Sequence, residues 1–235
     1  MDGTFSAAVM VALARIIAMD PQLFQIVRLS LAVSLSAVAI AATIGVPLGA
    51  AIAVGRFPGR QGVIVALNAM MGLPPVVVGL LLYLLFSRAG LLGPFGLLFT
   101  PGAMIAAQAV LTAPIIAALV RQSVEDAARE YHEQLASLGA GPIASAIALV
   151  WDIRFSLLTA VLAGFGRAAA EVGAVIIVGG NIDGVTRMMT TAIALETSKG
   201  DLPLALGLGF ILIGLIVLVN ATVYLVKEAA ARRYG

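Results

Sequence analysis

The stretch "LPLALGLGFILIGLIVLVNATVYLV" at residues 202–226 contains no charged side chain. A run of about 20 mainly apolar residues is long enough to cross the hydrocarbon core of a bilayer as a helix. The whole chain shares this character, because 61% of its 235 residues are hydrophobic and only 11% are charged. Soluble domains contain about 25% charged residues. The sequence therefore predicts an all-α fold, a polytopic membrane helix bundle.

Four further stretches have the length and apolar character of a membrane span. They are residues 29–55, 62–87, 101–120 and 155–180. Residues 5–19 form a shorter apolar run with Arg15 inside it, and we interpret them as an interfacial helix rather than as a sixth span. We expect a single transmembrane domain over residues 1–235 with about five spans.

Lysine and arginine are shared unevenly between the connections of these spans. Cytoplasmic loops of membrane proteins are enriched in both residues. One set of alternating connections contains Arg56, Arg60, Arg121, Arg129, Arg154, Lys227, Arg232 and Arg233, and the other contains Arg88, Arg187 and Lys199. The asymmetry predicts a cytoplasmic C-terminus, a cytoplasmic loop at residues 121–154 and an N-terminus on the outer side.

Proline and glycine interrupt three of the predicted spans, at 62–87, 101–120 and 202–226. The sequence "GLPPVVVG" at 72–79 places two adjacent prolines inside a span. Such breaks persist where neighbouring helices or a water-lined cavity satisfy the freed backbone groups. Ordinary kinking with close packing by small residues is the alternative. Several breaks together favour a bundle that moves and forms a cavity.

The loop at 121–154 concentrates charge and then turns. Ser123, followed by acidic residues, predicts a helix that runs to about Leu138 and ends at Gly139. Pro142 is suited to begin a second short helix. We expect this helix–turn–helix to project into the cytoplasm and to dock into the groove of a partner. A solvated connecting loop is the alternative.

The sequence "EQLASLGAG" at 133–141 resembles the coupling loop of bacterial ABC importer permeases, whose pattern is Glu-Ala-Ala, three residues and Gly. Glu133 and Gly139 match this pattern, while Gln134 and Leu135 replace the two alanines. Longer stretches at 72–96 and 164–209 resemble the molybdate and tungstate group of these permeases. The run "TRMMTTAIALETSKGD" that begins at Thr186 is closer to the tungstate branch. The resemblance covers residues 22–228.

The resemblance implies a type I ABC importer transmembrane domain in a prokaryotic plasma (inner) membrane. Two copies of the chain would form the pathway as a homodimer, a cytoplasmic ABC ATPase dimer would drive it, and an extracytoplasmic binding protein would deliver the oxyanion. The chain contains no Gly-x-x-x-x-Gly-Lys-Ser/Thr sequence, so we expect a transporter subunit without its own ATPase site or cofactor, with ATP used by the partner. The net charge of +2 is too small to indicate a nucleic-acid partner.

The resemblance also implies which residues contact the ATPase and which anion is carried. The implied coupling residues are Glu133, Gly139, Ala140, Gly141, Pro142 and Ser145. The implied substrate is tungstate, with molybdate, sulfate or another small anion as alternatives. A secondary transporter would carry repeated intramembrane acids and an inverted repeat, and the sequence has neither. A membrane scaffold would not need a docking loop, and an intramembrane enzyme would need a constellation of reactive side chains.

Arg167 and Glu171 are four residues apart inside the predicted span at 155–180. Charges at that depth are costly, so we expect them to face the bundle interior and to pair. They either form a structural ion pair or lie along the anion path, to which we also assign Asn181, Thr190 and Thr191. A short re-entrant or surface helix packed by its methionines is the alternative for 186–198. The chain has no cysteine and one histidine, so we expect no metal site.

Overall fold

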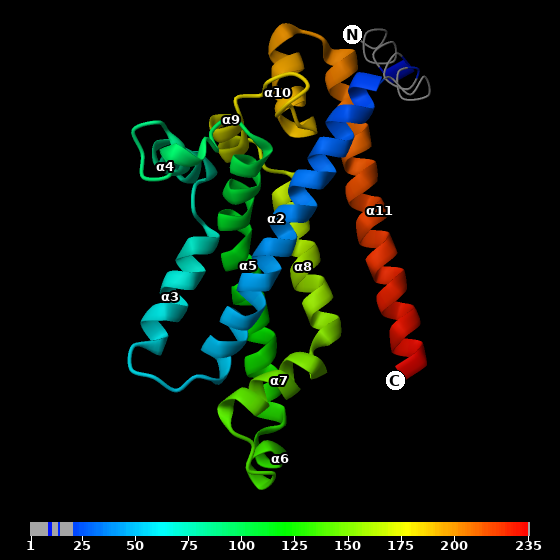
Figure 1. Ribbon diagram of the computed structural model, residues 1–235. Coiled ribbons are helices and arrows are strands. Elements are labelled where there is room, and N and C mark those ends of the chain that lie inside the picture. Colours follow the sequence, from blue (N-terminus) through cyan, green and yellow to red (C-terminus); the bar gives the residue numbers. More distant parts are fainter. Residues whose placement is uncertain (1–8, 11–13, 15–20, 235) are drawn as a thin grey trace. The chain divides into compact units, whose positions relative to one another are not determined.

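The computed structural model describes residues 9–10, 14 and 21–234 (Figure 1). Every regular element in these residues is a helix, so the predicted all-α fold is confirmed. Most of the interfacial helix predicted at 5–19 lies outside the described residues.

Ten α-helices and one 3₁₀ turn are described. In chain order they are α2 (Pro21–Val54), α3 (Arg60–Met71), α4 (Pro75–Phe86), η1 (Gly93–Phe95), α5 (Pro101–Glu130), α6 (His132–Ser137), α7 (Pro142–Asp152), α8 (Arg154–Ala169), α9 (Gly173–Gly179), α10 (Met189–Lys199) and α11 (Leu202–Tyr234). Three of them, α2, α5 and α11, are long and apolar enough to cross a membrane. The bent pairs α3–α4 and α7–α8 raise the number to five if each pair is one span. The predicted polytopic helix bundle is therefore confirmed.

The chain divides into two compact units. Unit 1 comprises Met1–Ser36, Pro74–Gln108 and Ala169–Thr222, and unit 2 comprises Ala37–Leu73, Ala109–Ala168 and Val223–Gly235. The long helices α2, α5 and α11 contribute residues to both units.

The break predicted at 72–79 is observed. The N–H of Gly72 donates to the carbonyl of Ala69 at 3.1 Å, and that of Leu73 donates to Met70 at 3.3 Å, which tightens the end of α3. The two prolines that follow have no N–H to continue the helix, and the second, Pro75, begins α4. Proline suits this first position because its missing donor would be unsatisfied in any case.

The breaks predicted in the spans at 101–120 and 202–226 are wrong. Helix α5 runs without interruption through Pro114, and α11 is continuous through its glycines. A proline removes one backbone hydrogen bond, which a long membrane helix tolerates when its neighbours satisfy the freed carbonyl. The separate helix predicted to begin at Ser123 is also wrong, because α5 continues to Glu130. Residues 121–130 contain neither glycine nor proline and are rich in helix-forming residues, so nothing ends the helix there.

Glycines bring helices into close contact in unit 2. A Cβ added at Gly45 of α2 would lie 3.0 Å from the carbonyl oxygen of Ala113 in α5, and one at Gly49 would lie 2.4 Å from that of Ala117. A Cβ at Gly164 of α8 would lie 2.9 Å from side-chain atoms of α5. Small residues let the backbones of membrane helices approach this closely. Helix association in a membrane has no hydrophobic driving force, so close van der Waals and backbone contacts stabilise it instead. Helix α5 is therefore the common partner of α2 and α8 in this unit.

Unit 1 has its own core. A Cβ at Gly79 of α4 would lie 2.8 Å from the Cα of Ala174 in α9, so these two helices are packed backbone to backbone. A separate apolar cluster joins the first turns of α2 with α10 and α11. Its buried members are Leu23, Ile26, Met189, Ala192 and Leu208.

Candidate functional site

Helices α6 and α7, with the turn at 138–141 between them, form a helical hairpin, residues 132–152, in unit 2. Gly139 has φ +62°, and its N–H donates to the carbonyl of Ala136 at 3.0 Å. The N–H of Ala140 donates to Leu135 at 3.0 Å. These two bonds are the Schellman pattern that ends a helix with a left-handed glycine. The prediction that Gly139 ends one short helix and that Pro142 begins the next is confirmed.

The hairpin turn is held by its own residues. The N–H of Ser145 donates to the carbonyl of Gly141 at 2.9 Å, and its hydroxyl donates to Ala140 at 3.4 Å. Gly139 and Gly141 in this turn are exposed, as is Pro142 at the start of α7. Glu133 lies exposed in the first turn of α6. All six residues predicted for coupling therefore lie on one hairpin: Glu133 in α6, Gly139, Ala140 and Gly141 in the turn, and Pro142 and Ser145 in the first turn of α7.

An exposed apolar face runs along α7, and the sequence reasoning missed most of it. Ile143, Ile147 and Trp151 are 77%, 67% and 72% exposed, and Leu138 in the turn is 80% exposed. Residues spaced by four lie on one side of a helix, so the three side chains of α7 form a stripe. The signal in the sequence was this spacing. An exposed apolar patch marks a surface that contacts a partner or a membrane.

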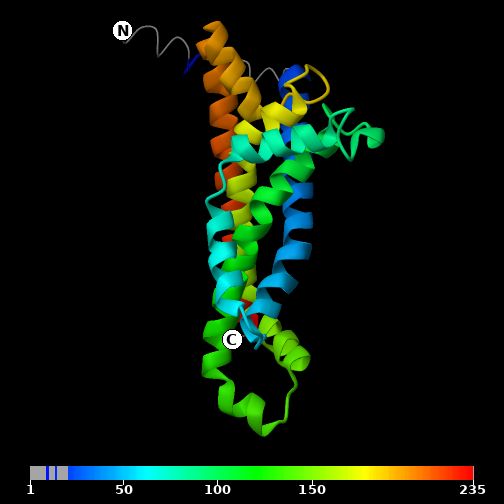
Figure 2. The same cartoon turned by 90° about the vertical axis from the view of Figure 1, so that its left-hand side faces the viewer.

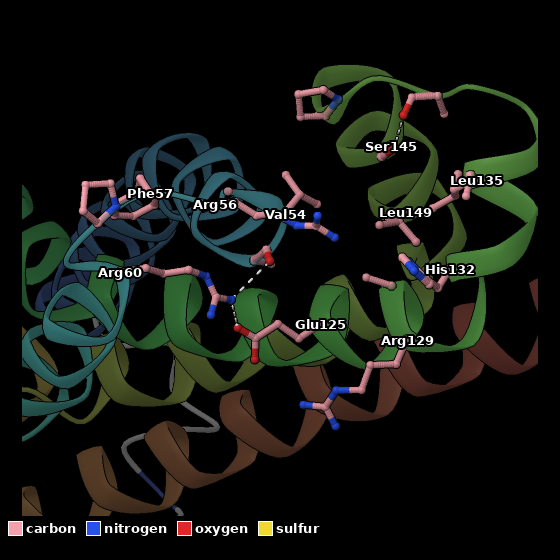
Figure 3. A pocket seen from close by; sticks show the side chains of 17 residues that line it. Val54, Arg56, Phe57, Arg60, Glu125, Arg129, His132, Leu135, Ser145 and Leu149 are labelled. Atoms are coloured by element: carbon pink, nitrogen blue, oxygen red, sulfur yellow. Dashed lines mark hydrogen bonds and ion pairs between the residues drawn. The ribbon is translucent and has the colours of Figure 1, made fainter.

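The opposite face of α7 lines a cavity of about 1500 Å³, which the end of α5 and the α2–α3 turn also line (Figure 3). Figure 2 shows α6 and α7 turning back from the end of α5. Five ionisable side chains face the cavity: Arg56, Arg60, Glu125, Arg129 and His132. Glu125 forms ion pairs with Arg60 and, at 2.6 Å, with Arg121. The cavity wall next to α3 is therefore fixed by charge pairing.

Glu171 belongs to unit 1 and lies in the break between α8 and α9. The expectation that it shares one helix with Arg167 is wrong, because α8 ends at Ala169 and α9 begins at Gly173. Its side chain is buried, and its Oε1 accepts a hydrogen bond from the N–H of Ala174 at 3.0 Å. Its carbonyl accepts from the hydroxyl of Thr190 at 2.8 Å. The break persists because side chains satisfy the backbone groups that the missing helix turns leave open.

The other residues predicted for the path flank this break in the sequence. Arg167 precedes it, and Asn181, Thr190 and Thr191 follow it. Asn181 adopts the left-handed region with φ +51°, and its Nδ2 donates to the carbonyl of Thr191 at 3.3 Å. The hydroxyl of Thr191 accepts from the N–H of Met188 at 3.0 Å. Both hydroxyls, those of Thr190 and Thr191, are therefore engaged within unit 1. Arg167 lies in the last turn of α8, in unit 2.

Within the described part of the chain, no group of three His, Asp or Glu side chains is placed to hold a metal ion.

No protein-family model matches the chain.

Similar proteins place this helical membrane protein in a family. The chain is 39% identical to the tungstate uptake system permease protein TupB of Peptoclostridium acidaminophilum, over 92% of this chain and 95% of that protein. It is 40% identical to a probable anion ABC transporter permease protein of Haloferax volcanii, over 85% and 88% of the two chains. It is 32% identical to the molybdenum transport system permease protein ModB of Escherichia coli, over 77% and 83%.

The chain belongs to the family of ABC transporter permeases for small anions. The family predicted from the motifs at 72–96, 133–141 and 164–209 is therefore confirmed. Its relatives are membrane subunits of transport systems, so the chain is a multi-pass membrane component of a transporter.

Proposed function

We propose that the chain is the permease subunit of an ATP-driven importer and forms the translocation pathway for a tetrahedral oxyanion, tungstate. The observation that carries this proposal is the likeness to a tungstate uptake permease over 95% of that protein's length. The molybdenum permease is less similar, at 32% identity, and makes molybdate the second candidate.

The proposed assembly has two copies of this chain, a cytoplasmic ABC ATPase dimer and an extracytoplasmic binding protein that delivers the anion. One chain contributes one hairpin at 132–152, so a homodimer would supply one docking element to each ATPase. The positive residues near α7 and at the end of α11 favour a plasma membrane orientation with the hairpin and the C-terminus in the cytoplasm.

The hairpin is the proposed coupling element. Its turn is ordered by the Schellman bonds of Gly139, and its exposed apolar side chains include Leu138 and Ile143. An ordered turn with exposed apolar residues fits a groove on a partner. Closure of the ATPase dimer on ATP would draw the two hairpins together and switch the pathway from inward-facing to outward-facing. Glu133, Gly139, Ala140, Gly141, Pro142 and Ser145 are the proposed contact residues.

Arg167, Glu171, Asn181, Thr190 and Thr191 are the residues proposed for the anion path or its gate. Arg167 is the only one of the five that carries a positive charge, so we assign the anion contact to it. Glu171 and Thr190 hydrogen-bond at the break between α8 and α9, and we assign them to shaping it. Asn181 and Thr191 hydrogen-bond to each other, and we assign them to shaping the connection of α9 to α10.

Native purification of the tagged chain from its own membranes tests the assembly. We expect a co-purifying ATPase, which is lost when the turn at 139–145 is altered. Reconstituted with its partners, the complex should import tungstate in preference to molybdate. A chain that purifies alone would contradict the proposal and would turn attention to gradient-driven transport. Uptake of molybdate with no preference for tungstate would contradict the substrate alone.

Arg167 is tested in the same complex. Arg167→Gln should abolish anion uptake and leave the ATPase bound, while Arg167→Lys, which keeps the charge, should retain part of the uptake. If the ATPase fails to co-purify with either variant, Arg167 has a structural role and the anion contact lies elsewhere.

A further inference from the structure

A single side chain in unit 2, that of Arg60, joins three helices (Figure 3). Its Nε donates to the carbonyl of Ile52 at 2.9 Å and its Nη2 to that of Ala53 at 3.2 Å. The last four carbonyls of a helix have no partner within the helix, so Arg60 caps the end of α2. Arg60 is also the first residue of α3 and forms an ion pair with Glu125 of α5.

Glu125 is held from both sides. Its second carboxylate oxygen pairs with Arg121, one turn earlier on α5, at 2.6 Å. The side chains of Arg60, Glu125 and Arg121 are 30%, 16% and 14% exposed. Solvent and salt screen such a cluster much less than a surface pair, and removal of one partner leaves a charge without compensation. The geometry of the three side chains is therefore strongly determined.

Two residues of the cluster, Arg60 and Glu125, line the same cavity as the hairpin. Glu125 precedes His132, the first residue of the hairpin, by seven residues, which is roughly 10 Å along a helix. On the other side of the hairpin, α7 faces the α2–α3 turn across the cavity. Apolar packing around Val124 and Leu149 also joins these elements, but apolar contacts have no preferred direction. Charge-assisted hydrogen bonds fix both distance and orientation.

We propose that Arg60, Glu125 and Arg121 form a link that carries movement of the hairpin to the end of α2 and the start of α3. Glu125 receives the displacement of α5, Arg121 keeps the carboxylate in place, and Arg60 passes the displacement to two carbonyls of α2. The three are positioning residues, because they act through the helices they join. The inference rests on the proposed function, since it takes the hairpin to be the element moved by the ATPase.

The test uses the complex of this chain with its ATPase and binding protein, reconstituted in liposomes. The readout is the number of ATP molecules hydrolysed per tungstate imported, together with the amount of ATPase bound. Glu125→Gln and Arg60→Gln should each raise this ratio by about fivefold or more, with the ATPase retained. The double variant should be no worse than the worse single variant, because either change already breaks the link.

Two variants make the same changes of charge beside the cluster. Arg56→Gln alters the other arginine of the α2–α3 turn, which lines the same cavity but forms no ion pair with a described residue. Asp126→Asn alters the next acid on α5, which is 60% exposed and pairs only loosely with Arg129 at 3.6 Å. Both should keep the wild-type ratio. A wild-type ratio in Glu125→Gln and Arg60→Gln would overturn the link.

Arg60→Lys keeps the inference testable if the neutral variants fail to assemble. Lysine retains the charge but lacks the planar guanidinium group, whose separate N–H donors bind Glu125 and the carbonyls of Ile52 and Ala53 at the same time. A raised ratio in the assembled Arg60→Lys complex supports the link, and a wild-type ratio refutes it. Failure of the proposed function looks different: the wild-type complex itself would lack a bound ATPase or would not import the anion.

Discussion

The hairpin at 132–152 and the broken region at 170–191 both interrupt helices, but they are stabilised in different ways. The hairpin turn closes through bonds between residues no more than five apart, from Ala140 to Leu135 and from Gly139 to Ala136. The broken region closes through distant partners. Thr190 reaches back to Glu171, and the N–H of Met189 donates to the hydroxyl of Ser30 at 2.8 Å, across 159 positions of the chain.

The difference distinguishes an interruption closed by its own residues from one closed by distant parts of the chain. The hairpin turn is closed by bonds between its own residues and is exposed, while Leu149 packs against the end of α5, so the hairpin can be displaced together with that end of α5. In the broken region Glu171, Thr190 and Thr191 are buried although residues 182–185 are exposed, and each buried hydrogen bond that is lost leaves a polar group without water to replace the partner. Substitutions in the broken region should therefore act on stability, and substitutions in the hairpin on coupling.

Loss of the Glu171 side chain is expected to have the largest effect on stability. Glu171→Ala removes the acceptor of the Ala174 N–H in a buried site and should lower the free energy of unfolding by about 1–3 kcal/mol. Glu171→Gln retains an oxygen that can accept this bond and should be less harmful. Thermal unfolding of the purified chain in detergent measures both.

Glu133→Ala is the matched change in the hairpin, where the carboxylate is exposed. It should leave the melting temperature unchanged. Equal melting temperatures for Glu171→Ala and Glu133→Ala would contradict the contrast between the two regions.

Loss of the Ser30 hydroxyl is expected to rank second. Ser30→Ala leaves the N–H of Met189, at the start of α10, without its acceptor and should destabilise the chain by about 1–2 kcal/mol. Thr43→Ala removes a hydroxyl from the same helix that donates only to Ala39 within that helix at 2.8 Å. Thermal unfolding should separate the two variants, and an equal shift would show that the bond to Met189 contributes nothing.

The sequence predicts the hairpin well because its signals are local. A glycine at the end of one short helix and a proline at the start of the next are three residues apart, and both act through backbone geometry. The break after Ala169 could not be predicted in this way. Residues 155–180 are almost uniformly apolar, so periodicity does not mark the end of α8, and Ser30 and Thr190 lie outside that window.

Helix boundaries were missed for a related reason. Ser123 with the acidic residues after it predicts a helix start, but α5 already passes through that position. Residues that suit the first turn of a helix are also tolerated in its interior, so they mark a helix start only where an earlier residue ends the preceding helix. Pro114 in the predicted span at 101–120 favours a break by its residue type, but one missing hydrogen bond in a long helix does not end it.

The glycine that ends α6 is expected to have a smaller effect on stability and a clear effect on transport. Gly139 has φ +62°, where an alanine costs about 1 kcal/mol relative to glycine. Gly139→Ala should therefore lower the melting temperature slightly and raise the ATP hydrolysed per anion imported, because the turn no longer holds its shape. Wild-type transport in Gly139→Val, which strains the turn further, would argue against a coupling role for the hairpin.

Gly141→Ala, two residues further on, should have the smallest effect. Gly141 has φ −70° and ψ 167°, an extended conformation open to any residue, and a Cβ there would meet no atom within 4 Å. We expect a change in unfolding free energy within about 0.5 kcal/mol. Comparison of Gly139→Ala with Gly141→Ala therefore distinguishes an effect of backbone conformation from an effect of a methyl group added at the surface. If Gly141→Ala uncouples transport while stability is unchanged, the added methyl group must meet the partner, and the turn itself lies in the groove. If only Gly139→Ala uncouples, the hairpin acts through its shape, and the exposed stripe of α7 carries the contact.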